Sequence, residues 1–306
     1  MRDNASDSAI RDITSVKSRW RVLPRSRRLR LAAAIGWILA VTLAFVQPLL
    51  ALFEHAAQSE LHSYIPLVPV VAGYLLYLRR NGLSTAYRTS TASAVGLLVI
   101  GSAILSAAVW NLFGTLSVND DLALRTMSYV CFVAAGCFLF LGAEWMQTAA
   151  FPVAFLIFVI PLPDAVVYRL EMASVFASAD VSAWMFRATG TPLLRDGTTL
   201  AIPGIVLRVA QECSGIHSSW VLLITSLVAS HLFLKSPWRQ LILVVFVIPL
   251  AIVRNGFRIL VIGLLCVHVG PHMIESYIHR QGGPIFFALS LAPLFLLLAW
   301  LRRQER

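Results

Sequence analysis

The stretch that decides the fold is QLILVVFVIPLAIVRNGFRILVIGLLCVHV, residues 240–269. It exceeds the roughly 20 apolar residues that a helix needs to cross a bilayer. Three polar side chains interrupt it, namely Arg254, Asn255 and Arg258. Each arginine near the centre of a membrane helix costs roughly 2.5–3.5 kcal/mol, even on the lenient insertion scale. A membrane helix that keeps both arginines indicates that they face the protein interior and serve a function, although an anchor between helices or a snorkelling arginine is the structural alternative.

The composition of the whole chain extends this prediction. Of its 306 residues, 58% are hydrophobic and only 13% are charged, and the mean hydropathy is +0.77. Soluble domains are closer to half apolar and a quarter charged, so the composition indicates an integral membrane protein. The net charge of +10 has a membrane explanation, because basic residues flank spans on the cytoplasmic side. No run alternates basic and aromatic residues as a nucleic-acid groove would, so no nucleic-acid partner is expected.

The first apolar run is LAAAIGWILAVTLAFVQPLLALF, residues 31–53, and it follows an arginine-rich tail. It is too long for a signal-peptide core and lacks a small-residue cleavage site, which predicts a retained spanning helix. The remaining predicted spans are 63–78, 92–115, 126–142, 149–162, 214–234, 240–269 and 284–301. We therefore predict an all-α polytopic membrane protein with about eight transmembrane helices. Its parts are a basic tail (1–30), a transmembrane domain (31–301) and a basic C-terminus (302–306).

The distribution of charge predicts the orientation of these spans. With a cytoplasmic N-terminus, the cytoplasmic segments hold 17 of the 25 lysines and arginines and the opposite side holds 6. The acidic residues are divided the other way, with 5 inside and 10 outside. The positive-inside rule therefore predicts an N-in, C-in topology. At about 1.5 Å per residue, Arg258 then lies about 16 Å from the outer end of its span, which predicts a site below the outer surface.

The segment before the 214–234 span differs from a simple loop. In YRLEMASVFASADVSAWMFRATG, residues 168–190, apolar residues recur at helical spacing with charges between them, which predicts an amphipathic helix at the outer interface. The next stretch, 191–212, has the turn residues Asp196 and Gly197 and β-branched alternation, which favour a short hairpin or extended loop. This stretch leads directly to Cys213.

Cys213 is the one cysteine with polar neighbours. Cys131, Cys137 and Cys266 lie in apolar stretches and are predicted to be small hydrophobes, and four scattered cysteines make no disulfide framework. Cys213 begins a span, where exposed backbone N–H groups and the helix dipole favour a thiolate. Glu212 opposes this, because a neighbouring carboxylate disfavours a second negative charge. The residues alone leave open whether Cys213 is a nucleophile or an ordinary helix-start cysteine.

Two histidines are candidates for a base beside this cysteine. His217 is one turn after Cys213, and His279 precedes a Gly-Gly-Pro turn at the mouth of the bundle. His268 and His272 are spaced for a metal pair with His279, but no Cys, Asp or Glu has the usual companion spacing. We therefore expect neither a metal nor another cofactor.

Five short motifs occur in a fixed order: IPLPD (160–164), TGTPLLRDGTTLAIPG (189–204), VAQECSGIHS (209–218), NGFRI (255–259) and HRQGGPIFF (279–287). The ordered set resembles the exosortases of the exosortase/archaeosortase family, over roughly residues 30 to 300. No one motif is specific by itself, but their order is. The chain ends soon after the last span, so we expect no fused accessory domain of the kind that some relatives carry.

The resemblance implies a membrane cysteine protease or transpeptidase at the outer face of the bacterial cytoplasmic (inner) membrane. Its partners would be C-terminal sorting signals of exported proteins, of the PEP-CTERM type, with a Pro-Glu-Pro-like motif, a transmembrane helix and a basic tail. Membrane lipids surround it, the acyl acceptor is water, a lipid or a glycan, and a link to exopolysaccharide production is implied. The resemblance makes Cys213 the nucleophile, Arg258 the oxyanion stabiliser and His279 the general acid and base. Asn255, Arg254 and His217 are supporting candidates, and Arg254 lies outside the motif.

Two other classes of protein remain as alternatives. A transporter would also bury Arg254 and Arg258, but it is expected to show repeated halves and helices broken near the midplane, and the sequence has no internal repeat. A membrane enzyme of exopolysaccharide or glycan assembly would use outer-face arginines and histidines without a cysteine. A scaffold is the weakest alternative, because it gives no reason to bury Arg258.

Overall fold

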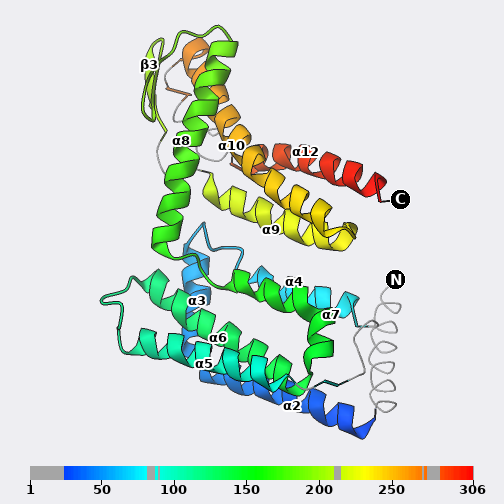
Figure 1. Cartoon of the computed structure of the whole chain (residues 1–306). Helices are drawn as coiled ribbons and strands as arrows, with labels where there is room; N and C mark the ends of the chain where they lie inside the picture. The colour runs from blue at the N-terminus through cyan, green and yellow to red at the C-terminus, as the bar shows by residue number, and fades with distance from the viewer. Residues whose placement is uncertain are drawn as a thin grey trace, which may run out of the picture. The chain divides into compact units, whose positions relative to one another are not determined.

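The computed structural model describes residues 24–80, 87–88, 90–209, 215–270, 272–273 and 283–305. The chain divides into two compact units, Met1–Pro163 and Asp164–Arg306, and each is described by itself (Figure 1). Both consist mainly of apolar helices, and the second unit adds a small sheet.

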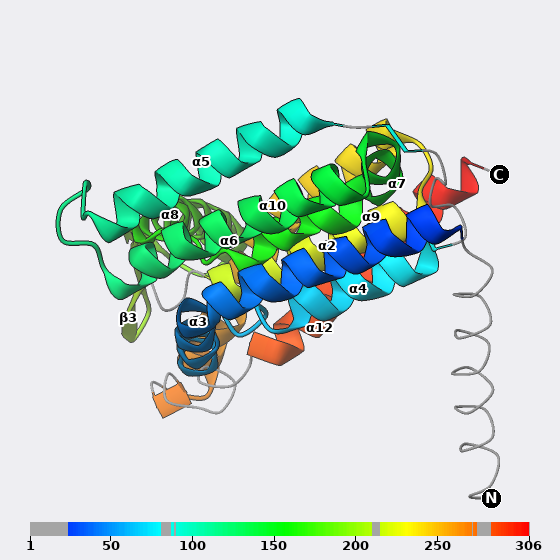
Figure 2. The same ribbon diagram turned by 90° about the horizontal axis from the view of Figure 1, so that it is seen from below.

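The first unit is helical throughout its described elements. These are α2 (Arg25–Ala44), α3 (Val46–Gln58), α4 (Leu67–Leu78), α5 (Thr91–Val109), α6 (Val118–Phe140), α7 (Ala143–Ala154) and the 3-10 helix η1 (Phe155–Val159). Helix α6 packs against both α5 and α2 (Figure 2). The crossing with α2 is close, because a Cβ atom added to Gly136 would lie 2.0 Å from Cδ1 of Trp37. The indole Nε1 of Trp37 also donates a hydrogen bond to the Phe132 carbonyl (2.9 Å).

The predicted span 31–53 is not one straight helix. Helices α2 and α3 are separated at Phe45 and meet at an angle of 70°. Pro48 explains the break, because it has no N–H for the Ala44 carbonyl and its ring clashes with that carbonyl. Within α3 the same proline lies in the first turn, where the missing N–H is not needed.

Within the described residues, five helices are long and apolar enough to cross a membrane: α5, α6, α9 (Ile216–Phe233), α10 (Pro237–His268) and α12 (Gly283–Arg303). The number rises to seven if each of two broken helix pairs counts as one span. The all-α polytopic class is therefore confirmed, whereas the count of eight is not. One reason is that the predicted span 63–78 holds only α4, whose 12 residues extend about 18 Å, short of a hydrocarbon layer of about 30 Å.

The second unit begins with α8 (Asp164–Ala188), followed by three strands, β1 (Leu194–Asp196), β2 (Thr199–Ile202) and β3 (Ile205–Arg208). The strands form an antiparallel sheet in the order β1-β2-β3. The expected helix over 168–190 is thus confirmed, and of the two alternatives for the next stretch the structure has the hairpin. The position of the helix at the outer interface stays a prediction. Helices α9, α10 and α12 complete the unit.

Two apolar cores are arranged along α10 (Figure 1). One lies between α8, the sheet and the C-terminal half of α10, and it includes Val175, Phe186, Leu200, Leu207 and Leu260. The other lies between α9, α12 and the N-terminal half of α10, and it includes Leu222, Leu243, Val247, Leu294 and Leu298. Residues 254–258 lie between these two cores.

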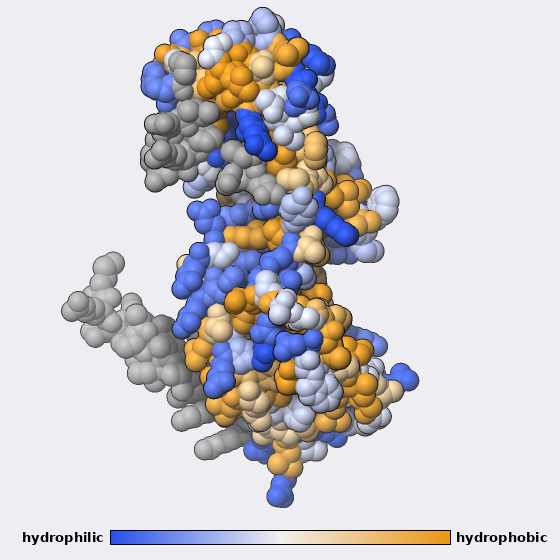
Figure 3. Space-filling model, turned by 90° about the vertical axis from the view of Figure 1, so that its left-hand side faces the viewer, coloured by the Kyte–Doolittle hydropathy of each residue, from blue (hydrophilic) through white to orange (hydrophobic). Residues whose placement is uncertain are grey.

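The exposed faces of the helices are apolar, as are the faces that pack in the cores. Large side chains such as Leu43, Trp110 and Leu296 are more than two-thirds exposed, at 71%, 73% and 71%. Figure 3 shows apolar side chains gathered over the surface of both units. Contiguous apolar surface of this kind is unfavourable in water and favourable against lipid, as expected of a multi-pass membrane protein.

The end of α12 is attached to the start of α10 through Glu305. Its carboxylate accepts hydrogen bonds from the backbone N–H groups of Lys235 (2.8 Å) and Ser236 (2.9 Å), and it pairs with Arg239 (3.5 Å). Ser236 is the N-cap residue of α10, so the carboxylate satisfies N–H groups at a helix start. The hydrogen bond from Ser236, then that from Lys235, and the neighbouring Arg239 together lower the pKa of Glu305.

Candidate functional site

Helix α10 brings the three predicted polar residues to the junction of the two cores. Arg254 and Asn255 are buried, with 7% and 2% of their surface exposed, and Arg258 is half-buried. Arg254 and Arg258 are one turn apart on one face of the helix. A Cβ atom added to Gly256 would lie 2.8 Å from Cγ1 of Val181 in α8, so this glycine permits the close approach of α8.

Asn255 faces α8. Its amide Nδ2 donates a hydrogen bond to the Ser178 hydroxyl (3.0 Å), and both side chains are buried. The Ser182 hydroxyl donates to the Ser178 carbonyl (2.6 Å) and lies 3.3 Å from the Gly256 carbonyl. Hydrogen bonds between membrane helices hold polar groups that would otherwise be buried without partners. Asn255 therefore attaches α8 to α10.

Arg254 faces α9 instead. Its Nη2 donates hydrogen bonds to the Gly215 carbonyl and to the Ser219 hydroxyl, both at 3.1 Å. Gly215 is the N-cap residue of α9 with a φ of +65°, and the Ser219 hydroxyl itself donates to the Gly215 carbonyl (2.8 Å). The other terminal nitrogen, Nη1, is buried and has no hydrogen-bond partner within the described residues. Arg254 thus attaches the first turn of α9 to α10.

A small apolar cavity of about 180 Å³ borders Arg254. Phe257 of α10 and Leu289, Ser290 and Pro293 of α12 contribute to its lining. The arginine therefore adjoins a low-dielectric space, in which a charge acts more strongly than in water.

The lengths of the helices show how far along α10 the polar cluster of Arg254, Asn255 and Arg258 lies. The 18 residues of α9 extend about 27 Å and the 21 residues of α12 about 31 Å, whereas the 32 residues of α10 extend about 48 Å. Arg254 lies about 26 Å from Pro237, and hence level with the start of α9. Beyond this level α10 is covered by α8 and the sheet (Figure 1).

Cys213 and His279 lie outside the described residues, so their roles stay predictions. The described chain resumes at Gly215, two residues after Cys213. There a Cβ atom would lie 3.1 Å from Nη2 of Arg254 and 3.3 Å from Oδ1 of Asn255. His217 lies half-buried in the first turn of α9. The structure therefore brings α10 against the backbone that follows Cys213.

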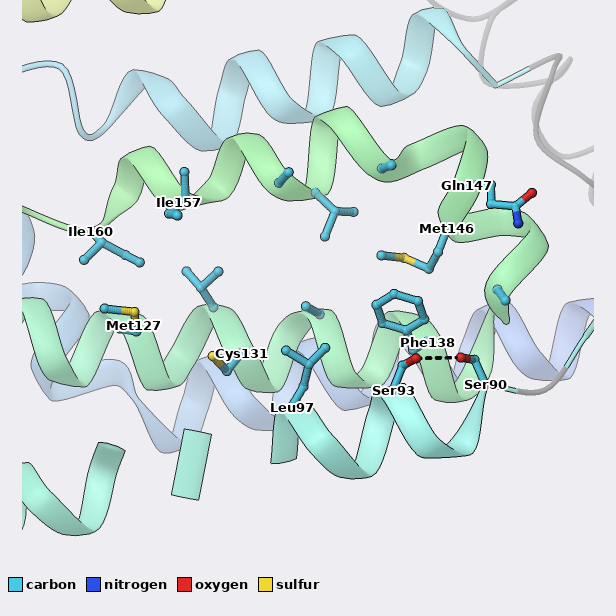
Figure 4. Close-up of a pocket in the computed structure, with 16 residues that line it drawn as sticks. Ser90, Ser93, Leu97, Met127, Cys131, Phe138, Met146, Gln147, Ile157 and Ile160 are labelled. Atoms are coloured by element: carbon cyan, nitrogen blue, oxygen red, sulfur yellow. Dashed lines mark hydrogen bonds between the residues drawn. The ribbon is translucent and has the colours of Figure 1, made fainter. Parts of the chain in front are cut away.

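A second, larger cavity has a different character. It has a volume of about 640 Å³, lies in the first unit, and is lined mainly by apolar side chains, among which Cys131 is half-buried (Figure 4). Ser90 and Ser93, joined by a 3.0 Å hydrogen bond, lie at one end with Gln147. None of its lining residues is a base for Cys131, so this cavity is not the candidate site. Cys137 and Cys266 are buried, and the described part of the chain holds no group of three His, Cys, Asp or Glu placed to bind a metal.

Four residues of the cluster were not predicted as site residues: Ser178, Ser182, Gly215 and Ser219. Ser174, Ser178 and Ser182 recur at every fourth position, which places them on one face of a helix. That spacing was a usable signal for a polar seam between helices. The partnership of Ser219 with Arg254 had no comparable signal, because the two residues are far apart in sequence.

Apolar helices long enough to span a membrane, packed around a buried polar cluster, are typical of a polytopic membrane protein. The family model for the transmembrane exosortase (Exosortase_EpsH) matches residues 54–296. The chain therefore belongs to the transmembrane exosortase family, whose members are of the transpeptidase or cysteine-protease type. Comparison with curated proteins and with solved structures gave no match.

Proposed function

We propose that this protein cleaves C-terminal sorting signals of the PEP-CTERM type from exported proteins, with Cys213 as nucleophile, at the extracytoplasmic face of the bacterial inner membrane. Arg258 stabilises the oxyanion and His279 is the general acid and base. Membership of the exosortase family supports the class of reaction. The excess of lysine and arginine in the predicted cytoplasmic segments supports the N-in, C-in orientation.

The observation that carries the proposal is that the polar residues of α10 are level with the start of α9, which Cys213 precedes by three residues. A hydrocarbon layer of about 30 Å accommodates α9, α12 and about the first 20 residues of α10. If Pro237 lies at the inner boundary, Arg254 and Arg258 come to the outer boundary. The peptide bond next to a substrate's own transmembrane helix reaches this depth while the helix stays in lipid.

The proposed reaction follows from these roles. The Cys213 thiolate attacks the carbonyl carbon, and the carbonyl electrons move to the oxygen, where the Arg258 guanidinium stabilises the negative charge in surroundings poor in water. When the intermediate collapses, the C–N bond breaks and His279 donates a proton to the leaving amine. An acceptor hydroxyl, amine or water then attacks the thioester, gives its proton to His279 and releases the thiolate. A glycan acceptor would provide the link to exopolysaccharide production.

The test is a pulse-chase experiment on a reporter that ends in a sorting signal. Cys213→Ala and Cys213→Ser are expected to leave the reporter at full length. Cys266→Ala is the matched control, since it removes a buried cysteine from the same unit and is expected to process normally. Normal processing by Cys213→Ala would overturn the proposal.

Two further variants distinguish the candidate bases, and one reagent tests the side of the membrane. His279→Ala is expected to block processing, whereas His217→Ala is expected to retain it. In a chain whose sole cysteine is Cys213, a membrane-impermeant maleimide added to spheroplasts is expected to stop the reaction. If the chain that keeps Cys213 as its sole cysteine is insensitive to the reagent, an enzyme of glycan assembly, which needs no cysteine, would be favoured.

A further inference from the structure

Arg254 is a buried charged residue that takes no part in the proposed reaction. It is an arginine with only 7% of its surface exposed, and the helix that carries it is otherwise mainly apolar. Both of its hydrogen bonds leave from one nitrogen, Nη2, and both end on the first turn of α9. Arg254 therefore donates its hydrogen bonds to a backbone carbonyl and a serine hydroxyl of the protein itself.

The acceptor of Arg254 is a tightly fixed group. The Gly215 carbonyl also accepts hydrogen bonds from the Ser218 hydroxyl (3.0 Å), the Ser219 hydroxyl (2.8 Å) and the Ser219 backbone N–H (3.0 Å). Arg254, Ser219 and the Gly215 carbonyl thus form a closed triangle, in which the Ser219 hydroxyl accepts from the guanidinium and donates to the carbonyl. A triangle of this kind restricts both the position and the rotation of the peptide group.

Gly215 is suited to this arrangement in two ways. Its φ of +65° lies in the left-handed region, which glycine adopts without strain. It also has no Cβ, which would lie 3.1 Å from Nη2 of Arg254. The backbone therefore approaches α10 more closely than any other residue would permit.

Two adjacent residues of α10 bind two different helices, α9 and α8. Arg254 binds the start of α9, and Asn255 binds Ser178 of α8. Arg258 lies one turn beyond Arg254 on the same face. Any movement of the start of α9 along α10 therefore changes the distance between Gly215, two residues after Cys213 in the sequence, and Arg258.

We propose that Arg254 is a positioning residue, which fixes the backbone following Cys213 against α10 and thereby sets the thiolate relative to Arg258. It acts through Gly215 and Ser219 and makes no contact with the substrate. This inference rests on the proposed function, because it assigns a task in the same reaction. A displacement of about 1 Å between reacting groups lowers a rate by up to about a hundredfold, so the expected effect is on kcat.

The test measures kcat and KM for cleavage of a sorting-signal peptide by the purified full-length protein in detergent. Arg254→Met, which removes the donors, is expected to lower kcat at least about tenfold with KM within about twofold. Arg254→Lys keeps a donor and a charge and is expected to recover part of the lost kcat. Ser219→Ala removes one side of the triangle and is expected to lower kcat about threefold. The control is Ser226→Ala, which removes a buried hydroxyl of α9 that bonds only within its own helix (2.8 Å to the Leu223 carbonyl) and is expected to keep kcat.

The double variant Arg254→Met/Ser219→Ala tests whether the two residues act as one unit. Its kcat is expected to equal that of Arg254→Met, because the triangle is already open. Three results would each overturn the positioning role. The first is a kcat of the double variant that falls by the product of the two single reductions. The others are a loss in kcat/KM of Arg254→Met that comes entirely from a raised KM, and an unchanged kcat in folded Arg254→Met. If Arg254→Met does not fold, the comparison of Ser219→Ala with Ser226→Ala decides the question. An inactive Cys213→Ala beside a normal Arg254→Met refutes only the positioning role, whereas an active Cys213→Ala refutes the proposed function itself.

Discussion

Gly263 gives the sharpest prediction about the packing that holds the site together. It lies on α10 in the core shared with α8 and the sheet. A Cβ atom at this position would lie 2.4 Å from Cζ of Phe186 and 3.1 Å from Cδ1 of Leu207. Carbon atoms in contact are about 3.5–4.0 Å apart, so the ring must move by more than about 1 Å. Phe186 is 0% exposed and belongs to the same core, so the movement has to displace other core side chains.

The expected change in stability follows from two opposing terms. Overpacking of a core costs about 1–3 kcal/mol, while replacing glycine by alanine within a helix contributes about 1 kcal/mol of stability. Gly263→Ala is therefore expected to lower the free energy of unfolding by up to about 2 kcal/mol, measured by SDS titration in mixed micelles. The control is Gly96→Ala in α5, where nothing lies within 4 Å of the new Cβ. That variant is expected to gain up to about 1 kcal/mol.

A second substitution makes this reasoning refutable. Phe186→Leu removes the Cζ atom that the new methyl group meets, although by itself it leaves a cavity and lowers stability. In Gly263→Ala/Phe186→Leu the loss is expected to be at least about 1 kcal/mol smaller than the sum of the two single losses. Additive losses, or a Gly263→Ala variant as stable as Gly96→Ala, would show that the close crossing is not the cause.

Three further predictions use the same unfolding measurement. Asn255→Leu removes the amide that binds Ser178 and is expected to lower stability by about 1–2 kcal/mol, and an unchanged value would mean that the bond contributes nothing. The Glu305 carboxylate, whose pKa is lowered in the folded protein, stabilises fully above its ordinary pKa of about 4.3 and loses this effect as the pH falls through the lowered value. Glu305→Gln is expected to remove that pH dependence, and a variant with the wild-type slope contradicts it. Gly136→Ala displaces the Trp37 ring and breaks its hydrogen bond to a backbone carbonyl, with an expected loss of about 2 kcal/mol against the Gly96→Ala control.

The class of fold was predictable because the bilayer imposes a length and a composition on each span. The stretch 240–269 differs from α10 (Pro237–His268) by a few residues at one end and by one at the other. Pro48, however, breaks a run that hydropathy reads as continuous, since hydropathy takes no account of a missing N–H. The charged residues Asp120, Asp121 and Arg125 fall between the predicted spans 92–115 and 126–142, yet they belong to the first two turns of α6. There Ser117 is the N-cap, and Arg125 pairs with Asp121 (2.7 Å).

The polar residues of the site were predictable for the opposite reason, namely that each violates the composition of its surroundings. Arg254, Asn255 and Arg258 are conspicuous within an apolar helix. Their partners are not, because Ser178 and Ser219 are small residues that helices tolerate anywhere. The packing of three helices decides which side chain of α10 faces α8 and which faces α9. The local sequence around these residues does not predict this.

Placing two arginines in a membrane helix costs free energy, and the surroundings of Arg254 and Arg258 offset this cost in different ways. Arg254 lies against the carbonyl of Gly215 and the hydroxyl of Ser219, so its transfer from water is offset by groups at a helix start that themselves need partners. Arg254 is also buried between the two cores, with 7% of its surface exposed, so the insertion penalty for a lipid-facing arginine does not apply to it in full. Arg258 is half-buried at the same junction, and the proposed reaction gives it a charge to stabilise in the transition state. If Arg254 positions the start of α9 and Arg258 stabilises the oxyanion, as proposed, the helix needs both arginines. That requirement accounts for their spacing of one turn better than a single anchoring role does.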